Sequence, residues 1–368
     1  MRVAFVHDNL VQRGGSERVL LSMLAAFPGA PVFTAFYRAE ATYPALMEQD
    51  VRPLPINRVG PLRRRHRAAF PTLPFLFSRL NVDADVVICS SSGWAQGVQT
   101  EGRKVLYFHA LAQWLHSPVE HVARASVARR AALGVARSTL VGWDNRTVRS
   151  ADRHLVMGPA MRARVAQLYG VDAEVLPPPI SLDADGPSRA VDGVVPGFFL
   201  AAARLMPYKN LDAVVDAFAQ LPGERLVIAG DGPEGHRLRS MAPGNVLFIG
   251  NADDVELRWL YANCRALVSA GFEAYPLTPI EAAGFARPTV ALREAGSVDV
   301  VVEGRTGEFF DRPAPDAIAA AVRRVDGGRY DDAEFQRLLD RHAESTFVAG
   351  LRDTVEHELG RVRKPLPS

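Results

Sequence analysis

The sequence predicts an α/β protein made of two doubly wound domains that face each other across a cleft. Short apolar runs alternate with amphipathic helical segments along the chain. The alternation stops once, at a run of three prolines, and then starts again. The chain of 368 residues is long enough for two domains and too long for one comfortable core. Because ligands of doubly wound sheets bind beyond the carboxyl ends of the strands, we expect the binding site in the cleft.

The first half begins with a strand at Val3–Val6. A Gly14-Gly15 turn leads from this strand to an amphipathic helix at Glu17–Phe27, and Ser16 is placed to cap the helix. Short strands separated by helical segments are joined by crossovers and form parallel sheets. Four further runs are interpreted as buried strands of this half: Val32–Ala35, Val86–Cys89, Val105–Phe108 and Leu155–Met157.

A stiff linker at Leu176–Ile180 separates the halves, because three consecutive prolines fit neither a sheet ladder nor a helix interior. We therefore expect a first domain over residues 1–180 and a second over 181–345. The last segment, 346–368, is expected to be a helix that packs back towards the first domain. The second half contains five predicted strands: Phe198–Ala201, Leu226–Ala229, Val246–Ile249, Ala266–Val268 and Thr289–Ala291.

Charge and cysteine content exclude several classes of protein. A formal net charge of +2 gives no reason to expect a nucleic-acid partner. Cys89 and Cys264 lie far apart, which excludes a disulfide scaffold or a cysteine zinc site and suits a reducing cytoplasm. The N-terminus lacks a signal-peptide core, and no apolar run approaches the roughly 20 residues of a membrane span. We expect a cytoplasmic protein, either free or bound to the inner face of the cytoplasmic membrane.

Two glutamates eight positions apart, Glu273 and Glu281, follow the predicted strand Ala266–Val268. A helix is expected to begin near Leu277 and Thr278, where free backbone N–H groups favour an anion. Glu281 would accept hydrogen bonds from ligand hydroxyls, and Glu273 would reach another part of the same ligand. From the spacing alone, two solvated surface acids are an equally good interpretation.

Two cations, Arg204 and Lys209, follow the predicted strand Phe198–Ala201. On a loop that leaves a strand, such a pair can hold a diphosphate, arginine through two parallel bonds and lysine as a point charge. A solvated turn is the commoner fate of such a pair. Only three of the 43 basic residues are lysines, and this rarity favours a functional role for Lys209.

The segment Gly230–Gly235 matches the dinucleotide-binding pattern G-x-G-x-x-G and follows a predicted strand. An NAD-dependent oxidoreductase is therefore an alternative. Against it, Asp231 and Glu234 would place carboxylates beside a pyrophosphate, and Pro233 removes an amide that should contact it. The dinucleotide interpretation is the weaker one.

Polar residues also end two predicted strands of the first half. His109 follows Val105–Phe108, and the loop Ser90–Trp94 follows Val86–Cys89. A lone histidine is more often structural than catalytic. A position at the carboxyl end of a strand, where ligands of such sheets bind, modestly favours a functional role for His109. The pair Asp83 and Asp85 resembles a metal-binding D-x-D, but it precedes its strand and is interpreted as a turn.

A basic segment precedes apolar residues in the first half. Cations beside the aromatic-rich run Phe70–Phe77 suit an anionic membrane surface. An arginine-rich loop leading to a buried helix is an equally good interpretation. The residues of the proposed membrane or acceptor surface are Arg63, Arg64, Arg65 and Arg67.

These segments together resemble glycosyltransferase family 4, retaining enzymes of the GT-B fold, and most closely the bacterial mannosyltransferases of lipid-linked polysaccharide synthesis. The resemblance covers nearly the whole chain. Its most specific part contains RLMPYKN, VIAGDGP, the E-x7-E element and EGRTGEFF, and the first half contributes GGSERVL and SSSGWAQGV. The resemblance implies two Rossmann-like domains.

The resemblance also implies roles for individual residues. Arg204 and Lys209 match the pair that holds the donor diphosphate, Glu273 faces the donor sugar, and Glu281 bonds the ribose. The residues implied to be catalytic are His109, Arg204, Lys209 and Glu273. Those implied to bind the donor are Gly14, Gly15, Gly250, Asn251, Leu277, Thr278 and Glu281.

The implied reaction moves a hexose, with mannose favoured, from a nucleotide-diphosphate sugar to a hydroxyl of a glycan or lipid-linked acceptor. No metal or other cofactor is implied. A catalytically inactive sugar-nucleotide-binding protein is the remaining alternative. One departure concerns the donor loop: many members have Phe-Gly where this chain has Tyr275 and Pro276, and Pro276 cannot donate a backbone hydrogen bond.

Overall fold

The structure is a computed structural model that describes residues 1–116, 127–294, 296–327 and 329–360. The chain divides into two compact units. Unit 1 contains Met1–Pro179 and the segment from Glu344 onward, and unit 2 contains Ile180–Ala343. The chain enters unit 2 directly after the three prolines. Of the C-terminal helix expected over 346–368, residues 361–368 lie outside the described residues.

Unit 1 contains a parallel sheet of seven strands among its described residues, in the order β3-β2-β1-β4-β5-β6-β7. The strand order reverses between β1 and β4, so this pair forms the topological switch point where ligands of such sheets bind. The strands are β1 (Val3–His7), β2 (Val32–Thr34), β3 (Val51–Pro53), β4 (Val86–Ser91), β5 (Arg103–Phe108), β6 (Arg153–Val156) and β7 (Glu174–Val175).

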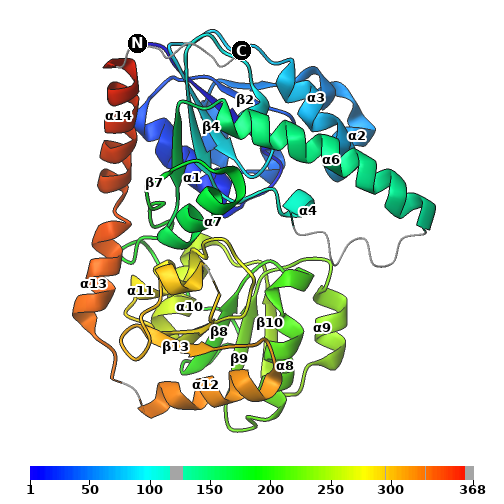
Figure 1. Ribbon diagram of the computed structural model, residues 1–368. Helices are drawn as coiled ribbons and strands as arrows, with labels where there is room; N and C mark the ends of the chain where they lie inside the picture. Colours follow the sequence, from blue (N-terminus) through cyan, green and yellow to red (C-terminus); the bar gives the residue numbers. More distant parts are fainter. Residues whose placement is uncertain (117–126, 295, 328, 361–368) are drawn as a thin grey trace. The chain divides into compact units, whose positions relative to one another are not determined.

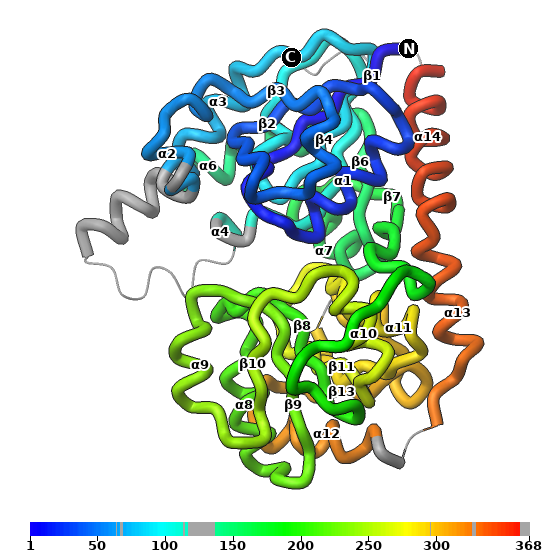
Figure 2. The backbone as a smooth tube through the Cα atoms, turned by 180° about the vertical axis from the view of Figure 1, so that it is seen from behind, coloured from blue at the N-terminus to red at the C-terminus, as the bar shows by residue number. Residues whose placement is uncertain are grey.

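The last helix of the chain, α14, packs against α1 (Figure 2). The Ser22 hydroxyl donates to Glu344 at 2.7 Å, and Arg352 donates to the Ala26 carbonyl at 2.9 Å. Phe347 is buried and lies edge-on to Tyr107 of β5. The helices of unit 1 are α1 (Gly15–Ala26), α2 (Gly60–Arg64), α3 (Leu73–Ser78), α4 (Gln113–His116), α6 (Val127–Arg149), α7 (Pro159–Tyr169) and α14 (Glu344–Gly360).

Unit 2 contains a second parallel sheet, with six strands in the order β10-β9-β8-β11-β12-β13 among its described residues. Its switch point lies between β8 and β11, which run side by side in parallel register. The strands are β8 (Phe198–Ala202), β9 (Leu226–Ala229), β10 (Val246–Gly250), β11 (Cys264–Ser269), β12 (Thr289–Leu292) and β13 (Gly307–Phe310).

Helices cover both faces of this sheet (Figure 1). Residues of α8, α9 and α12 form one apolar cluster with the sheet, and residues of α10 and α11 form another. This two-sided burial explains why the strands are almost wholly apolar. The helices are α8 (Leu211–Ala219), α9 (Gly235–Met241), α10 (Asp254–Asn263), α11 (Thr278–Ala283), α12 (Pro315–Gly327) and α13 (Asp332–Arg341).

Two local expectations need correction. Ser16 does not cap α1: the helix begins at Gly15 with Gly14 as its N-cap, so the Ser16 hydroxyl instead donates to Glu17 at 3.0 Å. Pattern reasoning also missed β3, β7 and β13, because two of these strands have two or three residues and the third begins Gly-Glu. Among the described residues, the search for a helix long and apolar enough to span a bilayer finds none.

Candidate functional site

The switch point of unit 2 brings together the two motifs that the sequence singled out. The loop after β8 carries Arg204 and leads into a 3-10 turn, Pro207–Lys209. The loop after β11 carries Glu273. Because β8 and β11 are neighbours in a parallel sheet, their loops leave the same edge, which explains how residues some 70 positions apart become neighbours.

Lys209 and Glu273 form an ion pair, with Lys209 Nζ 2.5 Å from Glu273 Oε2. Their side chains are only 11% and 23% exposed, so the pair is partly shielded from water. Gly271 makes this approach possible, since a Cβ there would lie 3.0 Å from Lys209 Cδ and 3.1 Å from Glu273 Oε1. A bound diphosphate would compete with Glu273 for the ammonium group.

Two hydrogen bonds join the loops on either side of this pair. The Phe272 amide donates to the Tyr208 carbonyl at 3.0 Å, and the Asn210 side chain donates to the Ala270 carbonyl at 2.8 Å. Asn210 has a positive φ of 52°, a conformation that asparagine tolerates better than most residues. These bonds connect the loop after β8, which carries Arg204 and Lys209, to the loop after β11, which carries Glu273. We call the two connected loops the platform.

Arg204 is exposed, and its guanidinium donates to the Tyr208 hydroxyl at 3.1 Å. Its loop is supported from behind by the segment Gly230–Gly235. A Cβ on Gly230 would lie 2.0 Å from the Ala203 carbonyl oxygen, and one on Gly232 would lie 2.5 Å from that of Leu205. The first two glycines of the G-x-G-x-x-G pattern are thus required by packing against the Arg204 loop.

Glu281 lies on α11 and has a different partner from Glu273. Its Oε2 accepts a hydrogen bond from the Tyr261 hydroxyl at 2.8 Å. Burial, and then the nearby Glu281 carboxylate, raise the pKa of Tyr261 well above its usual value, so this phenol remains a donor. Oε1 of Glu281 accepts no hydrogen bond from any residue that the structure describes. The carboxylate is therefore fixed on one side and available on the other.

The remaining predicted donor residues of unit 2 lie at two places. Leu277 is the N-cap of α11 and Thr278 its first residue. Gly250 ends β10 with a φ of 75°, and its carbonyl accepts a hydrogen bond from the Gly230 amide at 2.6 Å. Asn251, which follows, is exposed. The Gly250-Asn251 turn is thus tied to the segment that supports the Arg204 loop.

The Glu273 loop has two further supports that pattern reasoning missed. The Tyr275 hydroxyl and His342 Nε2 are 2.7 Å apart, and both side chains are buried. A Cβ on Gly296 would lie 2.5 Å from the carbonyl oxygens of Glu273 and Ala274. The hydroxyl that distinguishes Tyr275 from phenylalanine therefore anchors this loop to the end of α13.

In unit 1, His109 lies directly after β5 and is 7% exposed. Its Nε2 is 2.7 Å from the Ser90 hydroxyl, which lies 2.9 Å from His7 Nδ1. His7 and Ser90 are register partners of β1 and β4, so this cluster lies at the switch point of its sheet. Apart from their positions at strand ends, no sequence pattern singled out His7 or Ser90.

Asp8 holds the loop that follows β4. Its carboxylate accepts hydrogen bonds from the backbone amides of Ser92, Trp94 and Ala95 at 2.7, 3.1 and 2.6 Å. Burial raises the pKa of Asp8 to about 6, although these amides act in the opposite direction. Asp8 therefore has a structural role that its place in the sequence did not indicate.

The Gly14-Gly15 turn precedes α1. A Cβ on Gly14 would lie 2.6 Å from Glu17 Oε2, so the buried Glu17 leaves little room for a side chain there. Gly15 is exposed and begins the helix. The structure therefore keeps Gly15 accessible, as close approach of a ligand to its backbone would require.

The basic segment forms α2 and the turn that follows it. Arg63 and Arg65 are exposed, while the side chains of Arg64 and Arg67 lie outside the described part of the structure. Phe77 is fully buried, whereas Phe75 is 55% exposed with the Arg79 guanidinium 3.8 Å from its ring centroid. The segment thus combines an exposed cationic surface with a helix that is buried on one side.

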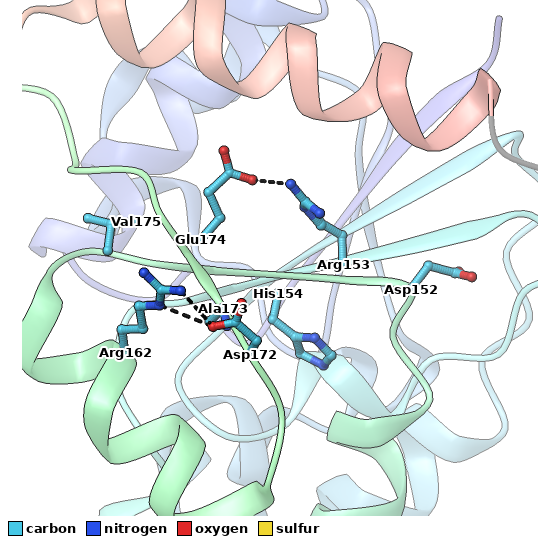
Figure 3. Close-up of a pocket in the computed structure, with 8 residues that line it drawn as sticks. All are labelled: Asp152, Arg153, His154, Arg162, Asp172, Ala173, Glu174 and Val175. Atoms are coloured by element: carbon cyan, nitrogen blue, oxygen red, sulfur yellow. Dashed lines mark hydrogen bonds and ion pairs between the residues drawn. The ribbon is translucent and has the colours of Figure 1, made fainter.

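A pocket of about 350 Å³ in unit 1 contains none of the predicted site residues (Figure 3). It is lined by Asp152 and Arg153 at the start of β6, so it lies at the amino edge of the sheet, away from His109. Four of its charged side chains pair with one another, Arg153 with Glu174 and Arg162 with Asp172, and Asp152 pairs with Arg103 outside the pocket lining. A search of the described residues for groups of three or more metal-ligating side chains finds none.

Comparisons with known proteins find similarity to one family model in the second half of the chain. Residues 195–331 match the family model described as glycosyl transferases group 1. The chain is 29% identical over 233 residues to D-inositol 3-phosphate glycosyltransferase 2 of Catenulispora acidiphila, covering 55% of this chain and 54% of that protein. It is 36% identical over 101 residues to a GDP-mannose-dependent alpha-mannosyltransferase of Corynebacterium glutamicum, covering 26% and 24%.

These curated relatives are matched over only part of their length. The first of them are covered over 14% to 54% of their own chains. Among solved structures, Anabaena HepE in complex with UDP-glucose superimposes with a TM-score of 0.70 at 17% identity, over 97% of this chain and 100% of that one. The fold is therefore of the GT-B type, with two Rossmann-like units.

Proposed function

Because residues 195–331 match the family model described as glycosyl transferases group 1, we propose that this chain is a retaining glycosyltransferase that uses a nucleotide-diphosphate sugar. The acceptor would be a hydroxyl of a glycan or a lipid-linked saccharide. Mannose is the favoured sugar, on the resemblance to bacterial mannosyltransferases and on the GDP-mannose-dependent relative. UDP-sugars are also tested as donors, because a protein with the same fold has been solved in complex with UDP-glucose.

The observation that carries this proposal is the platform at the switch point of unit 2. It presents Arg204 and Lys209 on one loop and Glu273 on the next, with Lys209 and Glu273 already paired. The negative charge of a nucleoside diphosphate would attract Lys209 and displace Glu273 from the ion pair. Glu273 would then be free to contact the sugar. Glu281, held by Tyr261, offers a carboxylate to vicinal hydroxyls such as those of a ribose.

The chemistry needs positive charge where the leaving group develops negative charge. When the bond from the sugar to the β-phosphate breaks, Arg204 and Lys209 would stabilise the charge that grows on the phosphate oxygens. The acceptor hydroxyl would attack from the face that the leaving group vacates, and its proton would pass to the departing phosphate. We propose that the two cations make a metal ion unnecessary for this step.

A donor screen tests the proposal directly. The protein is incubated with GDP-mannose, UDP-glucose, UDP-N-acetylglucosamine and NADH, and thermal shift and nucleotide release are measured with and without EDTA. Stabilisation by a sugar nucleotide with release of nucleoside diphosphate supports the proposal. Stabilisation by NADH alone would favour the oxidoreductase alternative, and tight donor binding without any release would favour an inactive binding protein.

Replacing Glu281 by alanine should abolish transfer without unfolding the protein. The variant loses the acceptor for ligand hydroxyls and leaves the Tyr261 hydroxyl without its partner, which is expected to cost about 1–3 kcal/mol of unfolding free energy. Donor affinity is measured by calorimetry and transfer by nucleotide release. Tyr261→Phe is the matched control, since it removes the internal hydrogen bond but keeps the carboxylate. Wild-type turnover in Glu281→Ala would remove Glu281 from the site.

We further propose that the exposed arginines of the basic segment bind an anionic membrane surface from the cytoplasmic side. Arg63 and Arg65 are exposed, and Phe75 adds an exposed ring nearby in the sequence. Attraction between such charges and acidic headgroups falls off over a Debye length of about 10 Å at 0.1 M salt. Such binding would bring the enzyme to a lipid-linked acceptor.

The protein is therefore expected to float weakly with vesicles that contain anionic lipid and not with neutral ones, and added salt should release it. Replacing Arg63 and Arg65 by alanine should abolish flotation. Arg164→Ala with Arg323→Ala serves as control, because these exposed arginines lie on other elements. Flotation that the Arg63 and Arg65 replacements leave unchanged would refute the proposal.

A further inference from the structure

Three polar side chains of unit 1 form one hydrogen-bonded array across neighbouring strands. His7 ends β1, Ser90 is its register partner on β4, and His109 directly follows β5. The Ser90 hydroxyl lies 2.9 Å from His7 Nδ1 and 2.7 Å from His109 Nε2. The array crosses the switch point between β1 and β4, where a ligand of this sheet is expected to bind.

Both histidines of this array are neutral. The exposed fractions of His7 and His109 are 2% and 7%, and that of Ser90 is zero. Burial lowers the pKa of His7 to about 4 and lowers the pKa of His109 well below its usual value, to which the neighbouring His7 also contributes. A neutral imidazole carries one N–H, so each ring has one donor nitrogen and one acceptor nitrogen.

The serine between them couples the two rings. A hydroxyl has a single hydrogen, so Ser90 donates to one nitrogen and accepts from the other. Hydrogen bonds donated by a hydroxyl are shorter than those donated by a ring N–H. The shorter contact, 2.7 Å, is to His109 Nε2, and the longer, 2.9 Å, is to His7 Nδ1. These lengths favour an array that runs from His7 Nδ1–H to the Ser90 oxygen, and from the Ser90 hydroxyl to His109 Nε2.

We propose that His7 and Ser90 are positioning residues that hold His109 in the tautomer protonated on Nδ1, ready to donate a hydrogen bond to a sugar oxygen. Among the residues that the structure describes, none hydrogen-bonds to Nδ1 of His109. In the other tautomer this nitrogen would carry a lone pair and could only accept a hydrogen bond from a sugar hydroxyl. The inference deepens the proposed function and rests on it for the sugar as the ligand of His109.

Nitrogen-15 NMR of the full-length protein labelled on histidine tests the tautomer without any assay of transfer. His109 and His7 should each show a protonated Nδ1 and a bare Nε2. Ser90→Ala should move His109 towards the Nε2-protonated form, because it removes the hydroxyl that donates to Nε2. His7→Phe should do so to a smaller extent, because it removes the donor that orients the Ser90 hydroxyl. His154 and His342 report on folding, since each has its own hydrogen-bond partner away from the array. A wild-type His109 protonated on Nε2, or one that neither variant changes, overturns the proposal.

Kinetics then test what the tautomer does. Ser90→Ala should lower kcat about tenfold, as expected for one weakened hydrogen bond in the transition state, and leave the KM for the donor unchanged. Ser90→Thr, which keeps a hydroxyl, should recover both the NMR pattern and kcat. A tautomer change with unaltered kcat overturns the role in the reaction. If the wild-type protein transfers from no donor, the proposed function fails, and the NMR comparison alone decides the arrangement of the array.

Discussion

Lys209→Ala is expected to lower the rate of sugar transfer about a hundredfold, equivalent to roughly 3 kcal/mol of transition-state stabilisation. Lys209 is a point charge on the platform where the leaving phosphate is expected, and its side chain is only 11% exposed. The variant also leaves Glu273 without its counter-charge, so this carboxylate would repel an incoming diphosphate. Loss of donor affinity should therefore accompany the loss of kcat.

The measurement is steady-state transfer with the donor that the screen identifies, together with thermal unfolding. The unfolding temperature should change little, because Glu273 is 23% exposed and water can solvate it. Arg323→Ala is the matched control, since it removes one exposed cation from α12 of the same unit. Turnover equal to that of the wild-type chain would show that Lys209 is not part of the site.

Gly230→Ala is expected to destabilise unit 2 by about 3 kcal/mol and to displace the Arg204 loop. The new Cβ would lie 2.0 Å from the Ala203 carbonyl oxygen, which is backbone and cannot swing aside. Gly230 also has a φ of 139°, a backbone angle that residues with a Cβ rarely adopt. Relief of the clash would move the segment that carries Arg204 and break the amide contact to Gly250.

Denaturant unfolding and donor binding are the two readouts for this variant. Gly244→Ala is the control, since a Cβ there meets no atom within 4 Å. The control should keep wild-type stability and donor affinity, whereas Gly230→Ala should lose both. If Gly230→Ala binds donor and unfolds like the wild-type chain, the Arg204 loop does not depend on this contact.

The central strands of both sheets could be predicted from the sequence because helices bury them on both faces. Such strands are mainly apolar, as at Val86–Cys89 of β4 and at Leu226–Ala229, and both strands were expected within two residues of their observed ends. Of the edge strands, β10 was predicted, as Val246–Ile249, whereas β3, β7 and β13 were not. Val51–Pro53 contains an exposed arginine and a proline, and only its neighbour in the sheet makes it a strand.

The charged residues of the candidate site could be predicted because each follows a strand that the pattern reveals. The residues that hold these charged side chains and their loops in place could not be predicted. Tyr261 holds Glu281 from another helix, and His342 holds Tyr275 from 67 positions away, so neither belongs to any local motif. The Gly230–Gly235 segment is ambiguous in sequence, because glycines that admit a neighbouring loop and glycines that admit a pyrophosphate look alike.

A ribosome completes unit 2 before it completes unit 1, because α14 is the last described element to be made and belongs to unit 1. Unit 2 has all its described strands by Phe310, and its two ends meet where the Ile180 amide donates to the His342 carbonyl at 2.8 Å. Unit 1 meanwhile lacks the helix whose Phe347, Leu351 and Val355 become buried. The first sheet of unit 1 therefore stays partly uncovered until synthesis has passed through unit 2 and reached α14.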